Sequence, residues 1–175
     1  MADTGINWGS VADWVSGLGS MSAGIIALCL AKSTTRIRLR GYCGIRVIIG
    51  QGTKPKDLIF VSVTNVGTRS TVINNIAMRV GGLRKKRFAV ITAVKDAYSV
   101  GVPFPLADGQ EGHWGIPLDE EKTWIKDLCK SFVTSPSDVQ TLRFTVHTNH
   151  GEVLTLKPED NLKKELLAHI ARKAT

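Results

Sequence analysis

Residues 57–66, DLIFVSVTNV, decide the fold class of this chain. Ile59, Val61 and Val63 recur at every second position, which is typical of a β-strand that buries one face. After a turn of sequence NVGT, residues 70–80, STVINNIAMRV, show the same spacing. Two neighbouring strands are therefore predicted.

The two-residue period continues on both sides of these strands. Apolar residues alternate along short stretches, and glycine-rich turns separate the stretches about every ten residues. This pattern predicts a mainly β domain, and we expect residues 42–157 to form an immunoglobulin-like β-sandwich. The further strands are expected near residues 45–49, 88–94, 113–116, 142–146 and 153–156.

Two accessory helices are expected beside the strands. Residues 119–132 begin with Asp119, a suitable N-cap, and continue with apolar residues at helical spacing. The sequence SPS at residues 135–137 is expected to end this inserted helix. Residues 158–175 form the second, an amphipathic helix that opens with acidic and closes with basic residues, as the helix dipole favours.

Residues 14–31, WVSGLGSMSAGIIALCLA, contain no charged side chain. As a helix, such a stretch measures about 27 Å, close to the roughly 30 Å of a bilayer's hydrocarbon core. We therefore expect a transmembrane helix before the domain. The alternative is a buried or interfacial helix of a soluble protein. The side chains expected to form the anchor are Trp14, Ile25, Ile26, Leu28 and Leu30.

The charges on either side of this stretch indicate its orientation. Residues 1–13, a short exterior tail, contain acidic residues and no Lys or Arg, which also argues against a cleaved signal peptide. Residues 32–41 are basic, and the cytoplasmic flanks of membrane helices carry the excess of Lys and Arg. The domain is therefore expected in the cytoplasm. The juxtamembrane basic residues, which can also bind anionic lipid headgroups, are Lys32, Arg36, Arg38 and Arg40.

Small residues recur at four-residue spacing in the apolar stretch. Ser16, Ser20 and Gly24 fall on one side of a helix, where small side chains let a second helix approach closely. This spacing permits a homo-oligomer formed through the anchor. The alternative is that small residues are simply common in membrane helices.

The composition is that of a folded chain with excess positive charge. Of its 175 residues, 43% are hydrophobic, and the net charge is +8. Part of that excess flanks the apolar stretch, so it does not require nucleic acid as a partner. Cys29, Cys43 and Cys129 lack the spacing of a metal site or a disulfide framework, so reduced thiols are expected.

The sequence contains no motif of catalytic grade, neither a P-loop nor a nucleophile elbow. His147 and His150 have a ligand-like spacing, but no carboxylate or third ligand lies close to them in sequence. A surface pair is therefore expected, with a zinc site as the alternative. We expect no enzymatic activity, no cofactor and no metal.

Four consecutive basic residues precede one of the predicted strands. They are a candidate patch for anionic contacts with lipid or nucleic acid, or a solvated edge that discourages sheet aggregation. The edge or a lipid contact is favoured, because no aromatic pair or helix-turn-helix pattern accompanies the cluster. The four residues are Arg84, Lys85, Lys86 and Arg87.

Three segments together resemble a known group of proteins: VSVTNVGTRSTVINNIAMRVG, PFPLADGQEGHWGIPL and LRFTVHTNHGEVLTL. Behind an N-terminal apolar helix, they are similar to small bacterial and prophage-type membrane proteins that have one transmembrane helix and an immunoglobulin-like domain. The resemblance implies that fold and a place at the bacterial inner membrane. It implies no catalytic residue, because the shared motifs are turn and core signals.

The sequence thus predicts a membrane-anchored, non-catalytic module that presents a β-sandwich to the cytoplasm and binds an unknown protein partner. One alternative is a soluble oligomeric structural or virion-assembly protein, in which the N-terminal helix is buried in the assembly. The other is a nucleic-acid binder that uses its basic residues.

Overall fold

The computed structural model describes residues 11–34, 36–50, 54–82 and 85–174 of the chain. They belong to two compact units, which are described separately below: residues 1–36 and residues 37–175. The first unit contains one helix, α1, Val11–Thr34. This helix begins before and ends after the predicted residues 14–31, with Asp13 in its first turn and Lys32 in its last.

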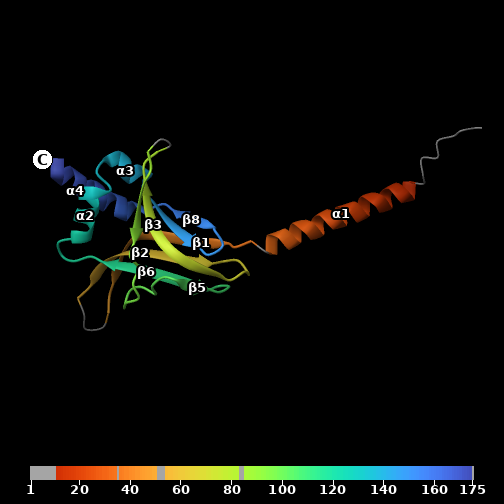
Figure 1. Ribbon diagram of the computed structural model, residues 1–175, viewed down its shortest axis with the longest axis horizontal. Helices are drawn as coiled ribbons and strands as arrows, with labels where there is room; N and C mark the ends of the chain where they lie inside the picture. The colour runs from red at the N-terminus through yellow and green to blue at the C-terminus, as the bar shows by residue number, and fades with distance from the viewer. Residues whose placement is uncertain (1–10, 35, 51–53, 83–84, 175) are drawn as a thin grey trace, which may run out of the picture. The chain divides into compact units, whose positions relative to one another are not determined.

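The second unit contains two antiparallel sheets (Figure 1). The first sheet has three strands in the order β1-β2-β6. Their bounds are Leu39–Ile48 for β1, Lys56–Asn65 for β2 and Glu111–Pro117 for β6. β2 lies between the other two strands, so both of its edges are paired, and its alternate residues Ile59, Val61 and Val63 face the core.

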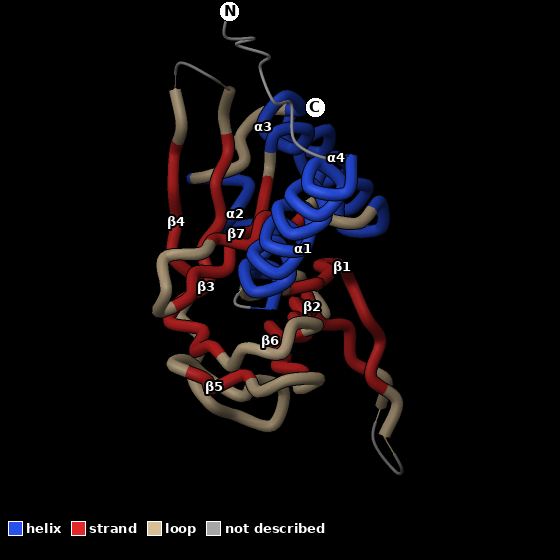
Figure 2. Tube along the Cα trace, turned by 90° about the vertical axis from the view of Figure 1, so that its right-hand side faces the viewer, coloured by secondary structure: helices blue, strands red, loops and turns tan. Residues whose placement is uncertain are grey.

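The second sheet has the order β4-β3-β7-β8, and a short strand, β5, pairs with the start of β3. The strands are β3 Thr71–Val80, β4 Arg87–Ile91, β5 Phe104–Leu106, β7 Arg143–Thr148 and β8 Val153–Leu156. Figure 2 shows β4 at the outer edge of this sheet, beside β3.

One hydrophobic core joins the two sheets. From β2, the alternating residues Ile59, Val61 and Val63 enter it, and from β3 residues such as Ile76 and Met78 do so. The prediction of a mainly β domain is therefore confirmed, because the two-residue period in the sequence corresponds to one buried face of each central strand. Each sheet covers the apolar face of the other.

Three helices gather at one end of the second unit (Figure 1). They are α2 Thr123–Ser131, α3 Pro136–Thr141 and α4 Asp160–Ala174. Ile125 and Leu128 of α2 are buried, as are Leu162 and Leu166 of α4, so both helices place apolar residues against the core. The C-terminal helix is thus packed on one face by β1, α2 and α3.

The structure differs from the sequence-based expectation at the inserted helix. Asp119 is not the N-cap: α2 begins at Thr123, whose backbone N–H and hydroxyl both donate to the Asp119 carboxylate, at 2.6 and 2.5 Å. The sequence SPS at residues 135–137 begins a helix, α3, instead of ending one. Ser135 and Asp138 form a capping box there, with Pro136 in the first turn.

The end of the basic juxtamembrane segment, residues 32–41, is part of the second unit. Its last residues, Leu39 to Gly41, already belong to β1 and pair with β2. The Arg38 carbonyl accepts a hydrogen bond of 2.8 Å from the Val66 backbone N–H. The domain therefore begins several residues before the predicted position 42.

The start of α4 closes one side of the second unit. Pro158 forms a bridge with Cys43 of β1, and the Glu159 backbone N–H donates to the Cys43 carbonyl at 2.8 Å. The Glu159 carboxylate accepts two hydrogen bonds of 2.6 Å from the Arg46 guanidinium. Hydrogen bonds from Arg46 therefore lower the pKa of Glu159 below its usual value. The chain thus ties β8 and α4 to β1 through charged and backbone groups.

We predict that Glu159→Gln destabilises the domain in a pH-dependent way. Both partners are more than a third exposed, so the loss is at most about 1 kcal/mol, or roughly 2–4 °C in Tm. The pKa of Glu159 is lowered on folding, so its contribution is present above the unfolded pKa of about 4.3 and is lost as the pH falls through the folded value.

Thermal unfolding followed by circular dichroism from pH 7 to pH 3 measures this effect. The difference between the wild type and Glu159→Gln should shrink in acid. Glu152→Gln, the same change at an exposed turn residue, is the matched control and should leave Tm unchanged. An equal difference at every pH would show that the Arg46–Glu159 pair is not its source.

Candidate functional site

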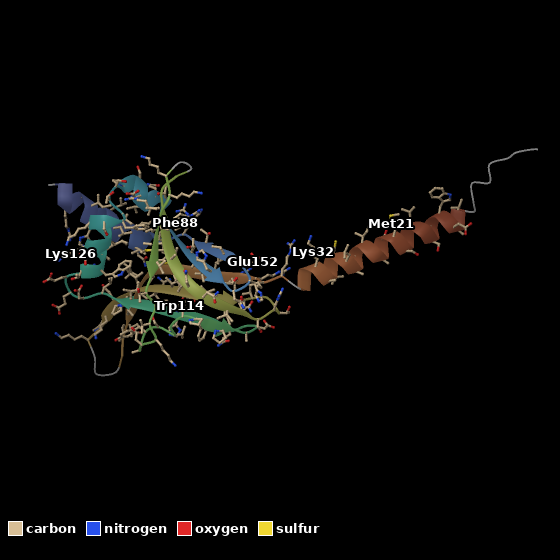
Figure 3. The ribbon with its side chains drawn as sticks, viewed as in Figure 1. Met21, Lys32, Phe88, Trp114, Lys126 and Glu152 are labelled. Carbon is tan, nitrogen blue, oxygen red and sulfur yellow. The ribbon has the colours of Figure 1, made fainter. Side chains whose placement is uncertain are left out.

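Helix α1 has the length and composition of a membrane span. Residues Val11–Lys32 of α1 have a mean hydropathy of 1.7 over 22 residues, and none of them is buried. Its large apolar side chains are exposed, small residues occupy the remaining side of the helix, and Met21 projects from it in Figure 3. The predicted anchor residues Trp14, Ile25, Ile26, Leu28 and Leu30 are between 57% and 71% exposed.

The small residues that permit helix association lie within α1. Ser16, Ser20 and Gly24 fall on successive turns and share one side of the helix. A Cβ added at Gly24 would meet no atom within 4 Å. Association of two anchors along this side stays a prediction.

The four juxtamembrane basic residues are divided between the two units. Lys32 lies in the last turn of α1, and Arg36 ends the first unit. Arg38 and Arg40 belong to the second unit and line a groove of about 570 Å³ beside the β7–β8 turn. Glu152 also lines this groove, so cationic and anionic groups share it.

The candidate anionic-contact patch is divided as well. Arg84 lies outside the described residues, while Lys85 and Lys86 are exposed just before β4. Arg87 forms an ion pair of 2.9 Å with Asp138 of α3. Burial raises the pKa of Asp138, but hydrogen bonds from Arg87 and from residues 134–135 outweigh it and lower that pKa below its usual value. Arg87 is therefore occupied within the fold, and the exposed charge comes from the two lysines.

The histidine pair has a structural explanation. The His147 ring lies on the outer face of β7, with its Nε2 at 3.2 Å from the Thr145 hydroxyl, and His150 is exposed in the following turn. Among the described residues, no three His, Cys, Asp or Glu side chains converge on a position for a metal ion.

The sequence did not predict that β4 lies at the edge of its sheet with exposed apolar residues. Strand β4 is the last strand of its sheet, and Phe88 and Val90 on it are 65% and 68% exposed. The intervening residues, Ala89 and Ile91, point to the opposite face of the sheet, where Ile91 enters the core. The apolar residues Phe88 and Val90, predicted as strand residues, thus lie on the outer face. Figure 3 labels Phe88 on this strand.

Two pockets flank the end of β4 and share residues 91–94 as a common wall. The inner pocket, about 140 Å³, lies between the sheets and is lined by core residues including Ile76 and Trp114. The outer pocket, about 590 Å³, is open and is lined by Asn75, Val90 and residues 100–103. Apolar space is therefore available on both sides of this strand.

The outer face of the first sheet carries a row of rings. Phe60 stacks between Tyr42 and His113, with ring centroids 6.3 and 5.7 Å apart. The Arg46 guanidinium lies 4.9 Å from the centre of the Tyr42 ring. These rings contact one another and Arg46, so the row is explained by cross-strand packing.

Comparison with known proteins adds little to this geometry. No family model and no curated protein matches the chain. A crystal structure named "Putative ApaA Protein from Bordetella pertussis" is 16% identical, and the match covers 68% of this chain and 86% of that one with a TM-score of 0.32. At that score, the likeness carries no argument about fold or function.

We predict that Cys29 is protected in a bilayer. In liposomes whose domains face outward, a membrane-impermeant maleimide should leave Cys29 unlabelled, because it would lie in the hydrocarbon core. Cys43 and Cys129 are buried in the domain and should not react either.

Val153→Cys is the positive control, because Val153 is 47% exposed on the domain. That variant should label at one position in intact liposomes, and all four of its thiols should label in a denaturing detergent. Labelling of Cys29 in intact liposomes would exclude a transmembrane position for it.

Proposed function

We propose that this protein is a membrane-anchored, non-catalytic binding module, in which an immunoglobulin-like β-sandwich is held at a bilayer. The observation that supports this most is helix α1. It has 22 residues that are apolar enough to span a membrane, and none of them is buried. A helix that exposes this many large apolar side chains requires apolar surroundings. A bilayer supplies them, and two antiparallel sheets around one core are compatible with the proposed sandwich.

The charge distribution supports an orientation. Lys32 and Arg36 follow the apolar window directly, whereas Asp13 lies near its other end. Basic flanks stay in the cytoplasm, so the proposed domain faces the cytoplasm at a bacterial inner membrane and the N-terminus lies outside. The juxtamembrane basic residues then lie where anionic headgroups attract them.

The proposal of binding without catalysis rests on how the domain uses its reactive groups. Burial raises the pKa of the Cys43 thiol, which keeps it protonated and unreactive. The Glu159 and Asp138 carboxylates are held by arginines that join one element to another. These groups stabilise the fold, and the apolar surface along β4 is better suited to contact with another chain.

The two alternatives predict different partners for the same residues. A soluble assembly would cover α1 with other copies of the chain and would need no lipid. A nucleic-acid binder would use Lys85 and Lys86, and its affinity would fall steeply with salt. The stacked rings of Tyr42, Phe60 and His113 contact one another, so they favour base stacking less than an open aromatic platform would.

We predict that Ile25→Lys releases the protein from membranes. A lysine near the centre of the span costs about 3 kcal/mol, which shifts the insertion equilibrium by roughly a hundredfold. Ile49→Lys is the matched control, because Ile49 is 79% exposed but belongs to the domain. Carbonate extraction of bacterial membranes followed by immunoblotting measures the effect.

The wild type and Ile49→Lys should stay in the membrane pellet, and Ile25→Lys should appear in the supernatant. Protease added to spheroplasts should leave the domain intact, because the cytoplasm protects it. Release of the wild type by carbonate would contradict the anchor and favour the soluble assembly. Digestion of the domain from outside would reverse the proposed orientation.

A further inference from the structure

We propose that the free edge of β4 binds an extended segment of a partner protein, in which apolar residues at every second position are flanked by acidic residues. The segment would add a strand to the second sheet. This inference rests on the proposed function of a binding module and names the class of partner.

The backbone of β4 provides the first part of this site. In the order β4-β3-β7-β8, β4 pairs with β3 on one side, and no described strand pairs with its other side. An edge strand directs the N–H and C=O groups of alternate residues away from its sheet. Arg87–Ile91 offers about 17 Å of such an edge, enough for a segment of similar length. Main-chain hydrogen bonds at an edge supply affinity for extended peptides.

The apolar surface on both sides of β4 provides the second part. Side chains of an added strand point alternately to the two faces of the sheet. On the outer face they would contact Phe88 and Val90, which are both exposed. On the inner face they would reach the pocket between the sheets that Ile76 and Trp114 line. This arrangement selects a segment with apolar residues at alternate positions.

The charges around β4 decide the rest of the partner's chemistry. Lys85 and Lys86 precede the strand, and Lys95 lines the outer pocket beyond its end. Among the described residues, none of these three lysines has an ion-pair partner, whereas the nearby Asp138 carboxylate is taken by Arg87. Asp96 follows Lys95 and accepts a hydrogen bond of 2.7 Å from the Tyr98 backbone N–H. Three lysines against this one neighbouring carboxylate still favour acidic residues in the segment, most strongly at the end that meets Lys85 and Lys86.

A second copy of this chain fits the edge poorly. Two β4 strands related by a two-fold axis would run antiparallel, so Lys85 and Lys86 of one copy would lie near the end of the other that carries Lys95. Like charges would then meet at both ends, which disfavours pairing.

The test uses the full-length chain in detergent micelles and the fluorescein-labelled peptide DDVTVTVDD, followed by fluorescence anisotropy. The peptide DDVTPTVDD is the control, because proline removes a ladder N–H. We expect the first peptide to bind and the second to bind at least about tenfold more weakly. Equal binding of both, or binding of neither at millimolar concentration, overturns the proposal.

Matched variants locate the binding. Val90→Lys should weaken DDVTVTVDD by about tenfold or more, and Val153→Lys, the same change on β8, should leave the affinity unchanged. Relative to the wild type, the double variant Lys85→Glu and Lys86→Glu should bind DDVTVTVDD more weakly and KKVTVTVKK more tightly, a change that does not depend on the folding of Val90→Lys. Equal loss with Val153→Lys, or no change in the relative affinity for the two peptides, overturns the site.

Two further readouts separate the remaining outcomes. Peptide binding should slow amide hydrogen exchange in residues 87–91 and leave residues 153–156 unchanged. Tighter binding of a labelled oligothymidine than of the peptide, lost in the Lys85→Glu and Lys86→Glu variant but kept in Val90→Lys, would replace the peptide by nucleic acid. Because micelles remove any need for insertion, peptide binding by a protein that carbonate releases from membranes would uphold this site and contradict the anchor alone.

Discussion

The burial of one face of β2 and one face of β3 is the constraint on which the domain depends. These central strands supply Ile59, Val61, Ile76 and Met78 to a single core. Every other strand and helix of the second unit either extends one of the two sheets or covers apolar residues that the sheets leave exposed. Removing large apolar side chains from such a core costs about 2–5 kcal/mol each, a large part of a domain's stability.

The edges of β1, β6 and β4 are covered to different extents, and this difference makes β4 the candidate binding edge. On the β1 side, the chain from β8 passes Pro158 and Glu159 into α4, which bonds to the edge of β1. Along β6, residues 98–100 form hydrogen bonds with the strand and cover its edge. Strand β4 has no such cover among the described residues. Natural sheets protect an open edge with lysines, and here the same lysines favour acidic partners.

Local patterns were enough to predict the strands with a strict two-residue period. They could not identify strand partners, because β3 and β7 are about seventy residues apart and their pairing leaves no trace in the local pattern. Strand β5 was missed because it has three residues, one of them Pro105. The start of α3 had a usable signal, since Ser135 and Asp138 have capping-box spacing, but Pro136 suggested a helix end.

The candidate site was harder to predict than the fold for a related reason. Phe88, Val90 and Ile91 are all apolar, so the sequence of β4 does not say which residues face the core. Their orientation is set by the register with β3, in which Ile91 lies opposite Ile76. The anchor needed no such information, because its length and lack of charge are properties of one continuous stretch.

The proposed anchor and edge are most useful in combination. A five-residue edge forms few hydrogen bonds, each with a net value of about 0.5–1.5 kcal/mol, so its affinity for a free peptide is low. If both partners are held at one membrane surface, association becomes effectively intramolecular, and the effective concentration can raise the overall affinity by roughly 10²–10⁴. A partner in solution gains nothing from this effect. The combination therefore selects a partner that is itself held at the same membrane, and it makes specificity depend on location as much as on the sequence of the bound segment.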